Sequence, residues 1–303
     1  MRAVVIGGSG QIGGWLLRVL RESGHEAVGT YATVAFPGLI ALDAAKLASA
    51  AEWVRAQRPD VVFYPAGFTW VDGCERDYGK ALAANLEQPF NLARVAAEAG
   101  GRFVYFSTDY VFDGRAGPYT EDSPTRPLSV YGRAKRDAER ALAAELGDRV
   151  LTVRTSWVFG PERQGKNFAY QLARTLAAGK PLVCPSDQVS TPGYSPDVAR
   201  AVVALVEQGH SGVVHVVGPD MLDRVTFAQA IARAFGLDPR LITGKTTAEL
   251  GQDAPRPLHG GLRTPKLDAW LPGAMRPLSA ALADFRTRTS NPAEGWANPL
   301  APP

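Results

Sequence analysis

The stretch of sequence that decides the fold lies at the start of the chain and reads RAVVIGGSGQIG over residues 2–13. An apolar run over residues 2–6 predicts a strand, and apolar residues recur at helical spacing over residues 15–20. Between the two lie glycines in a GxxGxxG pattern, Gly7, Gly10 and Gly13. Glycine permits a tight turn, a close approach of the backbone to a pyrophosphate, and close packing of the helix on the strand. This order of elements therefore predicts nucleotide binding, with the helix N-terminus facing the phosphates.

Outward from this unit, further apolar runs alternate with helical patterns. The runs predict strands, at residues 25–31, 39–43, 60–64, 102–106 and 149–154. Such alternation is typical of a doubly wound parallel α/β sheet, the Rossmann fold. We expect residues 1–156 to form a dinucleotide-binding domain whose sheet is completed by segments near 182–217. Residues 157–286 are expected mainly in a smaller C-terminal substrate-binding lobe, and the proline-rich residues 287–303 in a flexible tail.

The end of the second predicted strand bears on the choice of cofactor. An acidic residue there would bind the ribose 2′-hydroxyl of NAD, but Thr30 and Tyr31 occupy this position. The lack of an acid removes repulsion toward a 2′-phosphate, and no arginine stands nearby in the sequence to attract one. We therefore expect NADPH and leave NADH open. Asp43 follows the third predicted strand, where it either lies near the adenine or caps the helix predicted after it.

A polar cluster follows the strand predicted at residues 102–106. That strand ends in three small polar residues, Ser107, Thr108 and Asp109. Tyr131 and Lys135 lie four residues apart, so they share one face of the next predicted helix. A free tyrosine has a pKa near ~10, and a neighbouring lysine ammonium would lower it toward neutrality. A Thr108 hydroxyl could hold a substrate oxygen against the phenol, which suits proton transfer while hydride arrives from a nicotinamide. Tyrosine and lysine at this spacing are also common on ordinary amphipathic helices.

The composition excludes several classes of function. The chain has 303 residues and a net charge of +3, and its basic residues are scattered, so we expect neither nucleic-acid nor membrane binding. Its two cysteines and four histidines show no ligand spacing, so we predict no metal. The chain has no basic segment ahead of an apolar one and no window of 18 apolar residues, so we expect a cytoplasmic protein.

Several motifs together resemble the extended short-chain dehydrogenase/reductase superfamily. They are the glycine turn, FSTDYVFDG at residues 106–114, and YGRAK at residues 131–135. Within the superfamily, the chain is most similar to dTDP-4-dehydrorhamnose reductases and their relatives, over about residues 2–272. The narrower likeness lies in further segments, which are FTWVDGCE (68–75), RTSWVFG (154–160), NF (167–168), DQVSTPGYSPDVA (187–199) and RPLHGGLRTPKL (256–267).

The resemblance implies roles for individual residues. Tyr131 would donate a proton, Lys135 would lower the pKa of Tyr131 and hold the nicotinamide ribose, and Thr108 would orient the substrate oxygen. The cofactor would be bound by Gly7, Gly10, Gln11, Ile12, Gly13, Thr30, Asp43, Ala66, Gly67, Tyr131 and Lys135. The substrate would be bound by Thr69, Val71, Thr108, Asp109, Trp157, Asn167, Gln188 and Arg256.

Some of these positions have alternative interpretations or depart from the family pattern. Trp157 suits a sugar or a base but could pack between the lobes, and Arg256 suits a diphosphate but could form a surface ion pair. Tyr110 stands where related nucleotide-sugar dehydratases carry an acid, which disfavours dehydration. Gly193 and Gly260 stand where relatives often have threonine and serine, so the identity of the sugar is left open.

The activity that the resemblance implies is NAD(P)H-dependent reduction of the 4-keto group of a dTDP-linked 4-keto-6-deoxysugar. The expected partners are this nucleotide-sugar substrate and a second copy of the chain in a homodimer. One alternative is a non-catalytic NADP-binding regulatory subunit of another enzyme, as in methionine adenosyltransferase; the presence of all three catalytic side chains argues against it. Another is a nucleotide-sugar epimerase that retains its NAD.

Overall fold

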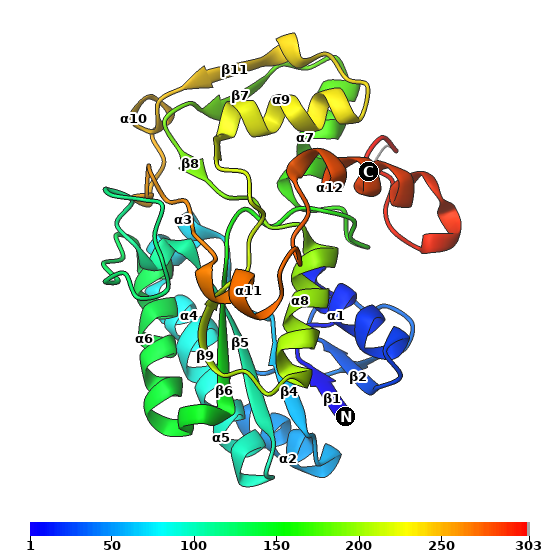
Figure 1. Cartoon of the computed structure of the whole chain (residues 1–303), viewed down its shortest axis with the longest axis vertical. Coiled ribbons are helices and arrows are strands. Elements are labelled where there is room, and N and C mark those ends of the chain that lie inside the picture. The colour runs from blue at the N-terminus through cyan, green and yellow to red at the C-terminus, as the bar shows by residue number, and fades with distance from the viewer. Residues whose placement is uncertain (302–303) are drawn as a thin grey trace.

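The computed structural model describes residues 1–301, and its larger part is built on one parallel sheet of seven strands (Figure 1). The strand order is β3-β2-β1-β4-β5-β6-β9, and every pairing in this sheet is parallel. The strands are β1 (Arg2–Val5), β2 (Glu26–Tyr31), β3 (Leu39–Ala41), β4 (Val61–Tyr64), β5 (Arg102–Thr108), β6 (Val150–Thr155) and β9 (Gly212–His215). The doubly wound α/β fold predicted from the sequence is confirmed.

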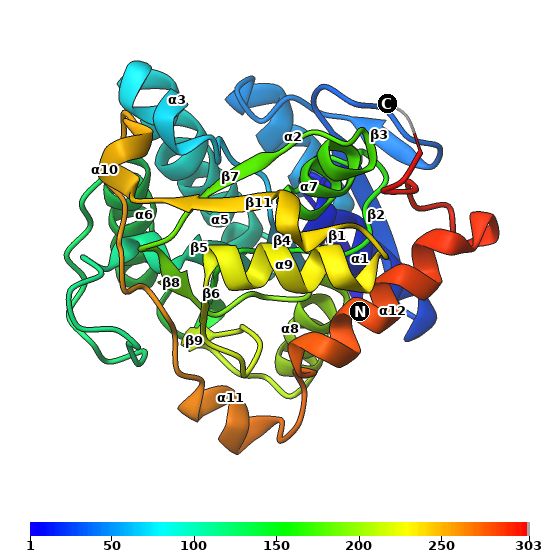
Figure 2. The same ribbon diagram turned by 90° about the horizontal axis from the view of Figure 1, so that it is seen from above.

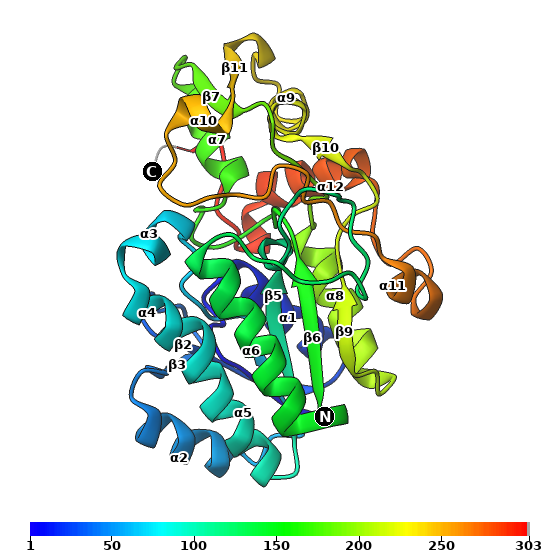
Figure 3. The ribbon, with the colours of Figure 1, turned by 90° about the vertical axis from the view of Figure 1, so that its left-hand side faces the viewer.

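Helices cover both faces of the sheet, as Figure 3 shows. One face carries α1 (Gln11–Glu22) and α8 (Ser195–Glu207), which pack together through a core that includes Leu16, Val202 and Val5. The other face carries α2 (Leu47–Gln57), α5 (Gln88–Glu98) and α6 (Val130–Leu146). Ahead of α5 lie α3 (Val71–Arg76), α4 (Tyr78–Leu82) and a π-helical turn, Ala83–Glu87. Strand β4 is buried along its whole length because both of its faces are covered.

A smaller lobe lies over the carboxyl ends of the strands, as the view from above shows (Figure 2). It contains two two-stranded sheets and the helices α7 (Phe168–Ala177), α9 (Arg224–Ala234), α10 (Thr247–Leu250) and α12 (Leu278–Ser290). Helix α11 (Pro265–Trp270) instead packs on β9 of the main sheet, where Leu267 joins the core. Parallel β7 (Leu182–Pro185) and β11 (Ile242–Lys245) form one sheet, and antiparallel β8 (Val189–Ser190) and β10 (Leu222–Asp223) form the other. The sequence placed segments near 182–217 in the main sheet, but only β9 joins it. Strand β7 finds its partner in β11 instead, so it belongs to the lobe.

The end of the chain differs from the flexible tail expected over residues 287–303. Helix α12 continues to Ser290, and the indole of Trp296 stacks on that of Trp15 with ring centroids 4.4 Å apart. Glu294 forms ion pairs with Arg18 and Arg288. These contacts compensate for the ordering of a proline-rich segment, so Glu294 and Trp296 pack on α1 of the dinucleotide-binding domain. Residues 302–303 of the expected tail lie outside the described part of the chain.

Among residues 1–301, no helix has both the length and the apolar character needed to cross a membrane. The same residues contain no group of three or more histidine, cysteine, aspartate or glutamate side chains that could hold a metal ion.

Candidate active site

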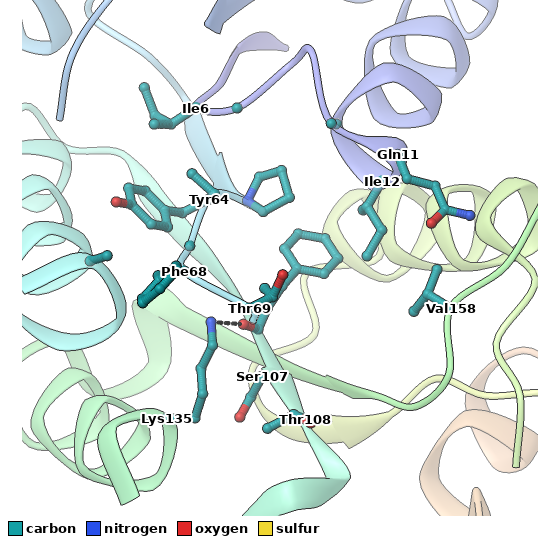
Figure 4. A pocket seen from close by; sticks show the side chains of 18 of the residues that line it. Ile6, Gln11, Ile12, Tyr64, Phe68, Thr69, Ser107, Thr108, Lys135 and Val158 are labelled. Carbon is teal, nitrogen blue, oxygen red and sulfur yellow. Dashed lines mark hydrogen bonds between the residues drawn. The ribbon is translucent and has the colours of Figure 1, made fainter. Parts of the chain in front are cut away.

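A cavity of about 730 Å³ runs along the carboxyl ends of the strands, between the sheet and the lobe (Figure 4). It lies where the strand order reverses, between β1 and β4, which is where ligands bind in open α/β sheets. The residues predicted for the site that line it are Gly7, Gly10, Gln11, Ile12, Gly13, Thr30, Asp43, Ala66, Gly67, Thr69, Val71, Thr108, Asp109, Tyr131, Lys135 and Trp157. Three predicted residues are not among the lining residues, namely Asn167, Gln188 and Arg256.

The glycine turn at one end of the cavity is held in a shape that only glycine allows. Gly7 has φ +95°, and a Cβ on Gly13 would lie 2.1 Å from the Gly7 carbonyl oxygen. The backbone N–H of Gly7 donates to Oγ1 of Thr30 at 3.3 Å, and that of Gly8 donates to the Thr30 carbonyl at 2.7 Å. Thr30 therefore supports the turn as well as lining the cavity.

The loop after β6 lies over the glycine turn and carries Arg163 and Gln164, which sequence reasoning did not single out. Nε2 of Gln164 donates to the Ser9 carbonyl at 2.8 Å, which brings the loop after β6 over the glycine turn. In that loop, the guanidinium of Arg163 lies 5.4 Å from the ring centroid of Phe36. An arginine from a distant part of the sequence therefore lies beside the loop between β2 and β3, although it is not among the residues that line the cavity.

Asp43 lines the cavity, and its carboxylate accepts from the backbone N–H of Ala45 at 3.0 Å. The N-cap of α2 is Lys46, and no side chain caps this helix, so the alternative in which Asp43 is the cap is wrong. A contact of Asp43 with the adenine stays a prediction.

A buried asparagine shapes the cavity after β4. Asn85 is fully buried, its Oδ1 accepts from the backbone N–H of Phe68 at 3.2 Å, and its Nδ2 donates to the Phe68 carbonyl at 3.0 Å. A Cβ on Gly67 would lie 2.8 Å from Oδ1 of Asn85. The close approach explains why glycine occupies position 67 in the cavity wall.

Helix α6 brings Tyr131 and Lys135 into the same cavity. Its first turn is fixed because Oγ of Ser129 accepts from the N–H of Gly132 at 3.1 Å. Nζ of Lys135 donates to the carbonyl of Phe106 at 2.8 Å, as the dashed line in Figure 4 shows. The same nitrogen lies 6.0 Å from the ring centroid of Tyr131. Both side chains are buried, and Thr108 lines the cavity beside them.

Burial has the largest effect on the pKa values of Tyr131 and Lys135. It raises the pKa of Tyr131, the charge of Asp109 adds to the rise, and the Thr108 hydroxyl opposes it. It also lowers the pKa of Lys135 to about 7, against an opposing effect of Glu139. The sequence led us to expect a tyrosine pKa lowered by the lysine, but the loss of hydration of the phenolate outweighs that attraction. Tyr131 is therefore a phenol at neutral pH, the form that donates a proton.

Asp109 ties the strand ends to the lobe. One carboxylate oxygen accepts from Oγ1 of Thr108 at 3.2 Å, and the other accepts from Oγ of Ser156 at 2.7 Å and Oγ of Ser190 at 2.9 Å. Burial raises the pKa of Asp109, and these hydroxyl donors act against the rise. The carboxylate therefore positions Thr108 by joining the ends of β5 and β6 to β8.

Trp157 packs against the lobe, as one interpretation of the sequence expected, and contact with a sugar or base stays a prediction. Its side chain lines the cavity, and its ring is stacked on Phe227 of the lobe with centroids 5.9 Å apart. The guanidinium of Arg224 also lies on Trp157, 3.9 Å from the ring centroid. Sequence reasoning did not single out Arg224, because it occupies the first position of a helix without any motif.

The three predicted residues that do not line the cavity are used within the protein. The side chain of Asn167 caps α7 and donates to the Gly160 carbonyl at 2.9 Å. Nε2 of Gln188 donates to Thr247 and Gln252, at 2.9 and 3.1 Å. The guanidinium of Arg256 forms a two-pronged ion pair with Asp72, at 3.0 and 2.8 Å. Each of the three side chains is therefore already hydrogen-bonded within the protein.

Comparison with known proteins identifies relatives over nearly the whole chain. The family model described as the RmlD substrate binding domain matches residues 1–290. The dTDP-4-dehydrorhamnose reductase of Mycobacterium tuberculosis is 32% identical over 299 residues, which cover 96% of this chain and 93% of that protein. A crystal structure of a dTDP-4-dehydrorhamnose reductase from Clostridium acetobutylicum superposes with a TM-score of 0.86 at 29% identity, covering 96% of this chain and all of that one. The reductase of Bacillus anthracis, solved in complex with NADP, gives a TM-score of 0.85 at 24% identity, covering 94% and 98%.

Proposed function

Because the chain belongs to the RmlD substrate binding domain family, we propose that it is an NAD(P)H-dependent reductase of nucleotide sugars. It reduces the 4-keto group of a dTDP-linked 4-keto-6-deoxysugar to an alcohol. The observation that carries the proposal is the shared cavity, which is lined by the glycine turn at one end and by Thr108, Tyr131 and Lys135 farther along.

Each of the three catalytic candidates has a chemical task in this reduction. The bound reduced nicotinamide supplies the hydride for the carbonyl carbon. The Thr108 hydroxyl orients the keto oxygen, and the phenol of Tyr131 gives that oxygen its proton. Burial keeps Tyr131 protonated until that step, because it raises the pKa of the phenol. The ammonium of Lys135, held by the Phe106 carbonyl, stabilises the phenolate that remains and holds the nicotinamide ribose.

The cofactor in this proposal is NADPH, and NADH can take its place. Gly7, Gly10 and Gly13 receive the pyrophosphate at the N-terminus of α1, where the backbone can approach closely. The end of β2 has no acid to repel a 2′-phosphate, and Arg163 lies over Phe36 just beyond it. NADP bound to the Bacillus anthracis reductase supports the same choice.

The substrate side consists of Thr69, Val71, Asp109 and Trp157 around the nicotinamide end of the cavity. Tyr110 also lines this end, and as a neutral phenol it cannot act as the base that a dehydratase needs. Reduction therefore accounts for the side chains better than elimination of water.

The proposal is tested with the purified chain, NADPH and a dTDP-linked 4-keto-6-deoxysugar. We expect the NADPH absorbance to fall only when the sugar is added, with one alcohol product per NADPH consumed. No loss of absorbance would refute the reductase. Two alternatives give other results: an epimerase would be purified with NAD already bound, and a regulatory subunit would bind NADPH without turnover.

The proposal also includes a homodimer and a cytoplasmic location. Light scattering at several protein concentrations measures the first, and cell fractionation measures the second. A monomer at all concentrations would remove the dimer from the proposal without affecting the chemistry.

A further inference from the structure

Arg224 stacks on Trp157, a residue that lines the cavity, although Arg224 is not itself among the lining residues. It is the first residue of α9, after Asp223, whose carboxylate accepts from the backbone N–H of Thr226 at 2.9 Å. Its guanidinium lies against two aromatic rings, 3.9 Å from the centroid of Trp157 and 4.6 Å from that of Phe168. Because Trp157 lines the cavity, this stacking fixes the planar guanidinium next to a residue of the cavity wall.

Within residues 1–301, the guanidinium of Arg224 has no ion-pair or hydrogen-bond partner, although it is largely buried. The nearby carboxylates accept hydrogen bonds from other groups. Asp109 accepts from Thr108, Ser156 and Ser190, and Asp223 caps its own helix. A largely buried charge without a partner is costly, so such a group is a strong binder for an anion that enters the site. Burial lowers its pKa only to about 10, so it is a cation at neutral pH.

The neighbours of Arg224 belong to the substrate end of the cavity. Its electrostatic neighbours include Tyr110 and Asp109, which line the cavity next to Tyr131, and also Arg256. Arg256 is the arginine that the sequence suggested for a diphosphate, but three of its N–H groups donate to Asp72 and the Ala254 carbonyl. The guanidinium of Arg224 has no such protein partners in the part of the chain that the structure describes, so all of its donors are available to a ligand.

We infer that Arg224 binds the diphosphate of the nucleotide sugar by donating to its phosphate oxygens. The inference rests on the proposed function and specifies how its substrate is held. With the sugar at Tyr131, the diphosphate must lie one sugar ring away from the reacting carbon, toward the lobe that carries Arg224. A guanidinium fixed by stacking presents two parallel N–H groups to two oxygens, which a lysine cannot reproduce.

The test measures equilibrium binding of dTDP and of thymidine to the full-length protein by calorimetry. Arg224→Gln should weaken dTDP binding about 10- to 100-fold, the range for charge-assisted hydrogen bonds, and leave thymidine binding unchanged. Arg224→Lys should restore only part of the loss. The control is Arg240→Gln, since Arg240 is an exposed arginine of the same lobe that pairs with Asp238, and it should bind dTDP like the wild type.

Several outcomes would overturn the inference. Equal dTDP affinity in Arg224→Gln and the wild type would do so, and so would an equal loss for dTDP and thymidine, because that pattern indicates a structural defect. A wild type that binds no dTDP would overturn both the inference and the proposed substrate class. A selective loss of dTDP binding in a protein that oxidises no NADPH would refute the proposed reductase and support the role of Arg224.

Discussion

The substitution Glu139→Gln should change both the free energy of unfolding and the pKa of Lys135, and the two effects can be measured separately. Glu139 lies one helical turn after Lys135 on α6, and its carboxylate receives two hydrogen bonds from Arg154 on β6, at 2.9 and 2.7 Å. Both side chains are about 5% exposed. The pair therefore connects the helix that carries Tyr131 and Lys135 to the centre of the sheet.

The expected loss of stability follows from the charge of Arg154, which the substitution leaves without an ionic partner. Removing one partner of a buried ion pair typically costs 3–5 kcal/mol, because the remaining charge is uncompensated. Glutamine can keep one of the two hydrogen bonds, so we expect a loss of about 3 kcal/mol in the free energy of unfolding. The negative charge of Glu139 also raises the pKa of Lys135 from the level that burial sets. Its removal should therefore lower the pKa of Lys135 below about 7.

Urea unfolding and the pH dependence of kcat/KM measure the two effects. If protonated Lys135 supports catalysis, activity falls as the pH rises through about 7, and this fall should move to lower pH in Glu139→Gln. The control is Glu145→Gln on the same helix, which breaks an exposed pair with Arg94 and should cost less than about 1 kcal/mol.

Removing both charges tests the explanation itself. The double variant Glu139→Gln, Arg154→Met leaves no unpaired charge, so it should be more stable than Glu139→Gln alone. The reasoning would be refuted if Glu139→Gln lost less than about 1 kcal/mol in the free energy of unfolding. It would also be refuted if the loss in the double variant equalled the sum of the losses in Glu139→Gln and Arg154→Met.

Two further predictions concern the cofactor. Gly13→Ala places a Cβ 2.1 Å from the Gly7 carbonyl oxygen, so NADPH affinity measured by fluorescence should fall at least about 10-fold. The control is Gly14→Ala, whose Cβ would have no neighbour nearer than 3.7 Å and which should bind NADPH normally. Similar losses in both variants would show that the turn geometry is not the cause. Arg163→Ala should raise the KM for NADPH about 10-fold and leave the KM for NADH unchanged, because only NADPH carries the 2′-phosphate; equal effects on both would exclude a phosphate contact.

Local patterns in the sequence predicted the parts of the fold that depend on neighbours in the chain. The strand after Met1, the glycine turn and α1 follow from short-range spacing, and so does the shared face of Tyr131 and Lys135. The cavity that these elements line was predictable as well, because parallel strands end at the same edge of a sheet.

Contacts between distant segments were not predictable in this way. The pairing of β7 with β11, and the stacking of Trp296 on Trp15, join segments that no local pattern connects. Arg256 has the residue type of a diphosphate ligand, but its pairing with Asp72 became visible only in three dimensions. For the same reason Arg163 and Arg224 were missed, since nothing in their local sequence distinguishes them from surface arginines.

The titration of the site was the least predictable property. Spacing alone suggested that Lys135 lowers the pKa of Tyr131, whereas the packing around both groups raises the pKa of the phenol and lowers that of the ammonium. Burial depends on every segment around the cavity, so its effect on two residues cannot be read from their separation along a helix.

The rate of NADPH oxidation by Tyr131→Phe, with a saturating dTDP-linked 4-keto-6-deoxysugar, tests the central claim most directly. We expect kcat to fall by at least about 100-fold while NADPH still binds, because the variant lacks the proton that the keto oxygen needs and keeps the other cofactor-binding residues. Tyr78→Phe, which alters an exposed tyrosine, should match the wild type. A Tyr131→Phe variant that turns over within about a factor of two of the wild type would contradict the account.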